Sequence, residues 1–385
     1  MATPASLLVE LGAVVLVLGI MARLAGRIGI SPIPFYLLAG LAVGEGGLVP
    51  LVTSEAFIEV GAEIGVIFLL LMLGLEYSAA ELIAALRSVA VPGAVDFLLN
   101  FTPGFLAGLV LGWGPIPAVF LGGITYISSS GIVAKLLGDH GWLSNRETPT
   151  VLSILVFEDL AMAVLLPILG VLALGGTAAT AAVTVLFAVL IMVAAITIAS
   201  RHGDRLGSIV FHRSDEVSLL SIFGLTLLIA GIAERASISA AVGAFLVGIS
   251  VSGAAVARAR SLLTPLRDLF AAVFFVFFGL RTDPSDIGEV AWVALGLAAV
   301  TGATKLAVGW WSARRQGIGR RGSLRAGVAL VARGEFSIVI AGLGAAVVGG
   351  RELVALAAVY VLLMAIAGPL AAKVADRGLA RVVLS

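Results

Sequence analysis

The stretch GGITYISSSGIVAKLL, residues 122–137, decides the fold of this chain. It lies in an apolar segment, 116–137, that is long enough to cross about 30 Å of hydrocarbon. Its glycines and three consecutive serines are poor helix formers, and hydroxyl groups compete for backbone hydrogen bonds. A helix that unwinds here would free backbone carbonyls and point two half-helix ends into a protein-covered or watery cavity. A packing face of small residues is the alternative, but it explains the glycines better than the hydroxyls.

A second interruption is expected in RAGVALVARGEFSIVIAG, residues 325–342. Arg333 and Glu335 lie near its centre and balance each other in charge, and Gly334 between them favours a break. This helix is seven helices further along the chain, so it runs in the opposite direction through the membrane. Two interrupted helices in opposed orientation that meet at the midplane indicate the inverted repeats of a secondary transporter.

The composition of the whole chain agrees with a membrane protein. Of its 385 residues 60% are hydrophobic and 12% are charged, and the mean hydropathy is +1.15. A soluble protein would have too thin a charged shell. Cysteine is absent, which excludes disulfides and thiolate metal sites, and the net charge of +1 gives no reason to expect nucleic acid. We predict an all-α polytopic protein with about thirteen transmembrane helices, at 6–24, 32–44, 57–76, 88–111, 116–137, 149–173, 178–200, 216–234, 238–255, 263–280, 289–312, 323–349 and 353–374.

Basic residues in the connecting segments predict the orientation of these helices. With the N-terminus outside, 19 of the 24 lysines and arginines fall in cytoplasmic segments, and the outer loops hold Arg235, Arg281 and Arg351. The first helix lacks a basic segment before it and is expected to be a span, not a removable signal. We therefore predict a multi-pass cell-membrane protein, N-terminus outside and C-terminus cytoplasmic, without a cytoplasmic regulatory domain.

Charged residues near the middle of these spans are the candidates for function, because an ionisable side chain there costs at least about 2.5–3.5 kcal/mol. Glu158 and Asp159 lie in LSILVFEDLAMAVLLP, and Lys305 lies at similar depth in VTGATKLAVGWW. Adjacent residues project about 100° apart, so the two carboxylates suit different tasks. One would pair with Lys305, and the other is a candidate for binding a mobile cation. A purely structural salt bridge is the alternative.

Other polar residues complete the candidate site. Asp96 and Asn100 lie one turn apart in the fourth helix, where support of the site and a plain interhelical hydrogen bond are both consistent with the sequence. The residues expected to line the interrupted helices are Thr125, Ser128, Ser129, Ser130, Arg333, Gly334 and Glu335. The sequence shows no nucleophile–base pair or metal-ligand set at one depth. We therefore expect neither an enzyme nor a cofactor, and no metal beyond a transported monovalent cation.

Six segments, taken in order, resemble the cation:proton antiporter-2 family and most closely its Kef-type members. They are SPIPFYLLAGLAVGEGGLVP at 31–50, FLLLMLGLEYS at 68–78, SSSGIVAKLL at 128–137, FEDLAMAVLLP at 157–167, TPLRDLFAAVFFVFFGL at 264–280 and ARGEF at 332–336. By this resemblance Asp159 matches the acid that carries cation and proton, Glu158 the variable position before it, and Lys305 the lysine that pairs in the core. Kef-type proteins commonly have Gln-Asp where this chain has Glu158-Asp159.

The resemblance also implies a domain organisation and a partner. A homodimer is expected, with a dimerisation part at about 1–80 and 216–280, a core ion-binding part at about 88–173 and 289–374, and a linker helix at about 178–200. The predicted function is antiport of K⁺, or of Na⁺ as the less favoured cation, against H⁺ by alternating access, with cation and proton competing for Asp159. A gated cation channel and a sodium-coupled solute symporter are the alternatives.

Overall fold

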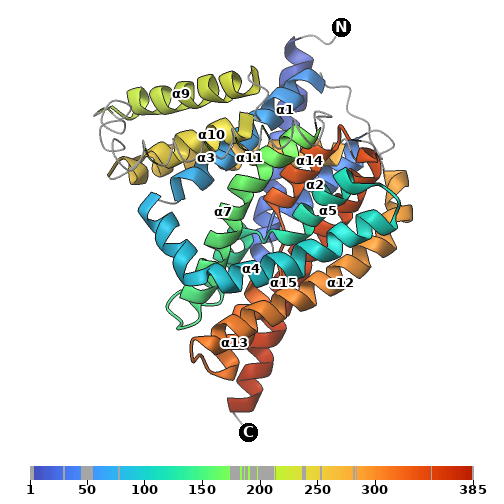
Figure 1. The fold of residues 1–385 in the computed structure, drawn as a ribbon. Coiled ribbons are helices and arrows are strands. Elements are labelled where there is room, and N and C mark those ends of the chain that lie inside the picture. The colour runs from blue at the N-terminus through green and yellow to red at the C-terminus, as the bar shows by residue number, and fades with distance from the viewer. Residues whose placement is uncertain are drawn as a thin grey trace. The chain divides into compact units, whose positions relative to one another are not determined.

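Helices make up the regular structure of the described residues in the computed structural model (Figure 1). These residues are 4–28, 31–44, 55–76, 79–173, 214–235, 240–251, 254–280, 284–347 and 349–383, with a few single positions between them. The predicted helix at 178–200 lies outside these ranges. Every other predicted helix has a counterpart, so the all-helical prediction is confirmed.

The two predicted interruptions divide their segments into pairs of short helices, and the remaining helices are continuous. The helices are α1 (Pro4–Ile28), α2 (Ile33–Val43), α3 (Glu55–Glu76), α4 (Ala79–Val110), α5 (Pro115–Tyr126), α6 (Ser130–Asp139), α7 (Thr148–Ala173), α9 (Asp215–Arg235), α10 (Ala240–Ser250), α11 (Ala254–Leu280), α12 (Pro284–Arg315), α13 (Arg320–Ala329), α14 (Glu335–Gly344) and α15 (Gly350–Val383).

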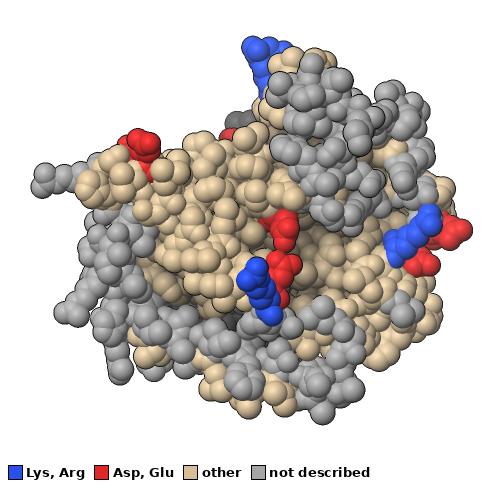
Figure 2. All heavy atoms as spheres, turned by 90° about the horizontal axis from the view of Figure 1, so that it is seen from above, with Lys and Arg blue, Asp and Glu red and all other residues tan. Residues whose placement is uncertain are grey.

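Much of the described surface is apolar, as a lipid-facing surface must be. Within the described residues, seven helical segments are long and apolar enough to cross a membrane, and α2, α14 and part of α3 are shorter apolar helices. Large hydrophobic side chains such as Val110 and Trp292 are 87% and 79% exposed. Figure 2 shows few charged side chains among the described residues of one face. The chain is thus a multi-pass membrane protein.

The first of two compact units comprises residues 1–54, 89–158 and 275–385, and it contains both broken helices. Ile127 and Ser129 are extended between α5 and α6, and the Ser129 hydroxyl caps α6 by accepting from the Ile132 backbone N–H at 3.2 Å. The break between α13 and α14 runs from Leu330 to Gly334. The two breaks touch, because the Ser129 backbone N–H donates to the Ala332 carbonyl at 2.9 Å.

The packing of the half-helices shows that the broken helices cross. The half-helix α5 packs against α14, and α6 packs against α13, so the first half of each broken helix meets the second half of the other. In Figure 1, α13 lies at one end of this unit while α5 and α14 lie toward the other. A Cβ atom at Gly334 would approach the Ser129 hydroxyl to 2.5 Å, which explains the glycine at the crossing. The prediction of two crossed broken helices in inverted repeats is confirmed.

The second compact unit comprises residues 55–88 and 159–274. In it α3, α9 and α10 pack side by side (Figure 1). The Phe68 ring of α3 stacks on Phe223 of α9 and on Phe270 of α11, with ring centroids 5.4 and 5.7 Å apart. Polar contacts of α11 add to this packing, because Arg258 pairs with Asp215 of α9 at 2.6 Å and Arg260 donates to the Leu75 carbonyl of α3 at 2.7 Å.

Two glycine contacts, one in each unit, repeat the same packing. In the first, a Cβ atom at Gly40 of α2 would lie 2.1 Å from a backbone oxygen of α11, and Gly40 also faces Gly279. In the second, a Cβ atom at Gly74 of α3 would lie 2.3 Å from a backbone oxygen of α10, and Gly74 also faces Gly248. These are the second and tenth, and the third and ninth, predicted helices. In an inverted repeat of seven helices, the second helix corresponds to the ninth and the third corresponds to the tenth. The symmetry between the repeats therefore converts one of these contacts into the other.

We predict that Gly40→Ala and Gly74→Ala each lower the melting temperature of the protein in detergent. The added methyl group would overlap backbone atoms, and overpacking of this kind costs about 1–3 kcal/mol. Gly296→Ala in α12 is the matched control, because a Cβ atom there meets nothing within 4 Å. Equal melting temperatures for all three variants would contradict the close packing of these helices.

Candidate ion-binding site

Two adjacent carboxylates of α7 are buried where the helix passes the first break. Glu158 is fully buried and Asp159 is 2% exposed. The Ser128 backbone N–H donates a short hydrogen bond to Glu158 Oε2, and the Ser128 hydroxyl lies 3.0 Å from Glu158 Oε1. This N–H is available because α5 ends at Tyr126 and α6 begins only at Ser130. The interruption of the helix therefore creates the donor that holds Glu158.

The Lys305 ammonium lies between two carboxylates, and all three side chains are fully buried. Its Nζ atom is 2.7 Å from Glu158 Oε1 and 2.7 Å from Asp96 Oδ2. Nζ also lies 5.3 Å from the ring centroid of Tyr126, where a cation is attracted to the aromatic face. The predicted pairing of Lys305 with Glu158 matches this geometry. Asp96 was expected either to support the site or to form a plain interhelical hydrogen bond, and in the structure it is a second direct partner of Lys305.

Asn100 links Asp96 to the broken helix. Its amide nitrogen lies 3.0 Å from Asp96 Oδ1, and its amide oxygen lies 2.7 Å from the Thr304 hydroxyl. Its backbone carbonyl accepts from the Thr125 hydroxyl at 2.8 Å. Thr304 was not among the predicted site residues, although its position one residue before Lys305 in the run TGATK was a usable signal.

Arg333 and Glu335, expected to balance each other in charge, do not form a direct ion pair among the contacts of the described residues, and each contacts a different part of the crossing. The Arg333 guanidinium is fully buried and donates to three backbone carbonyls, those of Thr125 at 3.1 and 3.2 Å, Leu330 at 3.1 Å and Val331 at 3.0 Å. These carbonyls lie at the C-terminal ends of α5 and α13, where unpaired oxygens carry partial negative charge. Arg333 therefore neutralises two half-helix ends.

Glu335 does the opposite at the start of α6. Its Oε2 accepts from the Ser129 hydroxyl at 2.6 Å, and its Oε1 lies 3.4 Å from the Gly131 backbone nitrogen. A carboxylate is favourable at the positive N-terminal end of a helix. Ser130, the first residue of α6, is half-buried. The predicted lining residues thus gather at the crossing, and their polar groups mainly serve the half-helix ends.

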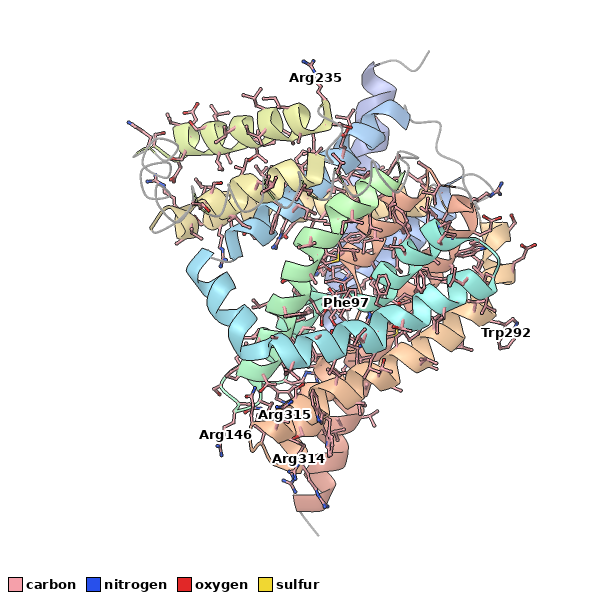
Figure 3. All side chains as sticks on the ribbon, viewed as in Figure 1. Phe97, Arg146, Arg235, Trp292, Arg314 and Arg315 are labelled. Carbon is pink, nitrogen blue, oxygen red and sulfur yellow. The ribbon has the colours of Figure 1, made fainter. Side chains whose placement is uncertain are left out.

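The charges on the rest of this unit are placed differently. Figure 3 shows Arg146, Arg314 and Arg315 gathered at one end of the unit, while Trp292, near the other end of α12, points away from the protein. Phe97, also labelled in Figure 3, lies inside the unit and packs on the Tyr126 ring, with centroids 4.9 Å apart. Apart from Glu147, which pairs with Arg325, the buried ionisable groups described in this unit are grouped around Lys305 and the crossing.

Buried charges beside two crossed broken helices in a multi-pass helical protein are typical of secondary transporters, whose ion sites lie at such breaks. Comparison with solved structures gives the same fold. The sodium proton antiporter MjNhaP1 from Methanocaldococcus jannaschii superposes with a TM-score of 0.69, over 94% of this chain and 95% of that one, at 16% identity. At that identity the likeness concerns the fold alone.

Sequence comparison gives the family. The model for the transmembrane sodium/hydrogen exchanger matches residues 12–374. The chain is 37% identical over 380 residues to the K⁺/H⁺ antiporter subunit KhtU of Bacillus subtilis, covering 96% of this chain and 94% of the relative. It is 30% identical to the ammonium/H⁺ antiporter subunit AmhT of Alkalihalophilus pseudofirmus, covering 93% and 90%. The chain belongs to the sodium/hydrogen exchanger family. The resemblance seen in the motifs, and the prediction of a transporter instead of an enzyme, are confirmed.

We predict that Arg333→Met lowers the melting temperature in detergent and that Arg333→Lys restores part of the loss. The methionine leaves three buried carbonyls without their charged donor, and each unsatisfied group costs about 1–3 kcal/mol. Arg315→Met is the matched control, because Arg315 is exposed at the end of α12 and lies 5.0 Å from the Trp311 ring. If Arg333→Met melts at the wild-type temperature, Arg333 does not hold the half-helix ends.

Proposed function

We propose that this protein exchanges a monovalent cation for protons by alternating access, and that cation and proton compete for Asp159. The proposal draws on the exchanger family, on the crossed half-helices and on the buried carboxylates of α7. A site that binds either ion, but not both, couples the two fluxes without a further energy source.

This proposal rests on different roles for the two adjacent carboxylates, Glu158 and Asp159. Glu158 has both oxygens engaged, one by Lys305 and the other by the Ser128 backbone N–H. A transported cation would have to displace a buried ammonium to reach it. Asp159 lies about 100° away around the same helix and is buried as well. It also matches the acid that carries cation and proton in the antiporter family that the motifs resemble, so we assign the carrier role to it. Glu158 then serves to position Lys305 and the broken helix.

The oxygen atoms of the first break support this division. The Thr125 carbonyl accepts from Arg333, the Ser128 hydroxyl lies 3.0 Å from both Glu158 and the Leu330 carbonyl, and the Ser129 hydroxyl donates to Glu335. These atoms have protein partners in this conformation. Any contribution from Thr125, Ser128 or Ser129 to the cation's oxygen shell would require an exchange of partners when the protein changes conformation.

The nature of the cation is inferred from the relatives. KhtU is named as part of a K⁺/H⁺ antiporter and AmhT as part of an ammonium/H⁺ antiporter. K⁺ is accordingly the favoured cation, and NH₄⁺ and Na⁺ are the competitors to compare. A cation current without proton movement would instead indicate a gated channel, and dependence on an organic solute would indicate a symporter.

The orientation and the oligomeric state belong to the same proposal. We place the end of the first unit that carries Arg146, Arg314 and Arg315 on the cytoplasmic side, because basic residues accumulate there (Figure 3). This puts the N-terminus outside. A homodimer, built through the part at about 1–80 and 216–280, is the proposed working form, and the part at about 88–173 and 289–374 would be the moving core.

Asp159→Asn should reduce cation/proton exchange in proteoliposomes to the background rate, because the amide neither carries an exchangeable proton nor offers a charge to the cation. Asp139→Asn is the matched control and should exchange at the wild-type rate. Asp139 is an exposed carboxylate that pairs with Lys135 at 3.0 Å on the surface of α6. Exchange near the wild-type rate in Asp159→Asn, with normal expression and melting, would exclude Asp159 as the carrier.

Raising the cation concentration should move the pH optimum of exchange toward acid. When a cation and a proton compete for one carboxylate, more protons are needed to displace the cation, so saturating cation shifts the optimum by up to about one pH unit per tenfold increase. The measurement is exchange as a function of pH at several K⁺ concentrations, with choline holding the ionic strength constant. An optimum that stays at the same pH would indicate separate sites.

A further inference from the structure

Asp96 is a buried carboxylate that the proposed exchange at Asp159 does not use. It lies in α4, and its Oδ2 accepts from Lys305 at 2.7 Å. Lys305 therefore faces two carboxylates with a single positive charge. The charges at the crossing do not supply a second cation, because Arg333 is engaged by backbone carbonyls and Glu335 offsets it in charge. If both carboxylates were ionised, one negative charge would remain in a fully buried cluster.

An excess buried charge of this kind is strongly unfavourable, and a titratable group normally binds a proton instead. The surroundings of Glu158 oppose a proton on that residue. Its Oε2 faces the Ser128 backbone N–H, which can only donate, and its Oε1 faces the Lys305 ammonium, which also only donates. The Ser128 hydroxyl could accept from Oε1, but Lys305 already donates to that oxygen. Glu158 is therefore held in its ionised form.

The surroundings of Asp96 accept either protonation state. With Asp96 ionised, the Asn100 amide nitrogen donates to Asp96 Oδ1 at 3.0 Å, and the Thr304 hydroxyl donates to the Asn100 amide oxygen at 2.7 Å. The Thr304 hydroxyl also lies 3.1 Å from the Thr301 carbonyl, a second acceptor within reach. An amide has a donor and an acceptor that exchange places when the group turns over.

With Asp96 protonated, each of these hydrogen bonds can reverse. The proton on Asp96 Oδ1 is donated to the Asn100 amide oxygen, the Asn100 amide nitrogen donates to the Thr304 hydroxyl, and that hydroxyl donates to the Thr301 carbonyl. The reversal gives up one hydrogen bond, from the Asn100 amide to the Asp96 backbone carbonyl at 3.0 Å. Buried polar groups are costly when unsatisfied, so a chain that is satisfied in both directions suits a carboxyl group that gains and loses a proton.

We propose that Asp96 is a second proton-binding residue of the exchanger, and that Asn100 and Thr304 adapt to its two protonation states by reversing their hydrogen bonds. The proposal rests on the proposed exchange function, to which it adds a proton site separate from Asp159. The charged groups that face Asp96 are Lys305 of α12, Glu158 of α7 and, at longer range, Arg333. Of these charged groups, Lys305 contacts Asp96 directly, with Nζ 2.7 Å from Asp96 Oδ2.

The test is infrared difference spectroscopy of the full chain in lipid as a function of pH, because the carbonyl stretch of a protonated carboxyl group is separate from the carboxylate bands. Asp159→Asn is used as the background so that the carrier does not contribute. In this background we expect a protonated-carboxyl band that changes with pH. The band should disappear in Asp159→Asn/Asp96→Asn and should remain in Asp159→Asn/Asp139→Asn, the matched control with the same substitution at an exposed carboxylate of α6. In Asp159→Asn/Glu158→Gln, Lys305 keeps a single carboxylate partner, so the band should appear only at lower pH.

A band that persists without Asp96, or that is lost with Asp139→Asn, would overturn the proposal. Carbon-13 labelling of aspartate carboxyl groups tests whether the protonated group is an aspartate, without a substitution at position 96. The band in Asp159→Asn protein should shift to lower frequency with labelled aspartate, and an unshifted band would assign the proton to a glutamate. The spectra require no transport, so they are paired with an exchange assay of the wild-type protein. An Asp96 band together with wild-type protein that fails to exchange ions would reject the exchange function, whereas normal wild-type exchange without the band would reject the role of Asp96.

Discussion

The interaction on which the rest of the structure depends is the contact of the Lys305 ammonium with the carboxylates of Asp96 and Glu158. An isolated charge of either sign in this place would be strongly unfavourable, because no water competes for it. The three residues come from α12, α4 and α7, so the ammonium fixes three helices of the first unit at the same depth. Glu158 extends this constraint to the break between α5 and α6 through the Ser128 backbone N–H. The ion pair and the interruption of the helix therefore stabilise each other.

Partial charges at the crossing of the broken helices are a second electrostatic constraint, and single side chains offset them. Four half-helix ends converge, two with unpaired carbonyls and two with unpaired N–H groups. Arg333 donates to the carbonyl ends of α5 and α13, while Glu335 and Glu158 accept at the break before α6. Protein groups thus meet the partial charges at three of these ends, those of α5, α13 and α6. Under the proposed mechanism Asp159 responds to the cation and the proton.

Much of this arrangement follows from the sequence, and the exceptions have clear physical reasons. The breaks could be predicted because Ser128–Gly131 and Gly334 disfavour a helix in a segment that is otherwise apolar. That Lys305 pairs with one of the two carboxylates of α7 could be predicted from depth, and the family resemblance, which matches Asp159 to the carrier, left Glu158 as the partner. The partners of Arg333 could not, because they are backbone carbonyls that become available only when two distant segments cross. Asp96 was recognised as polar and buried, but its contact with Lys305 depends on the rotation of α4 about its axis, which a nearly uniform apolar pattern does not determine.

Competition between cation and proton at Asp159 is the central claim, and proton release on cation binding tests it most directly. Purified protein in weakly buffered detergent solution, at a pH where it exchanges ions, would be titrated with K⁺ while a pH dye follows the free proton concentration, with choline as the salt control. The account predicts that K⁺ releases about one proton per chain, since one carboxylate cannot hold both ions, and that Asp159→Asn releases none. Binding of K⁺ detected by calorimetry without any proton release would contradict it.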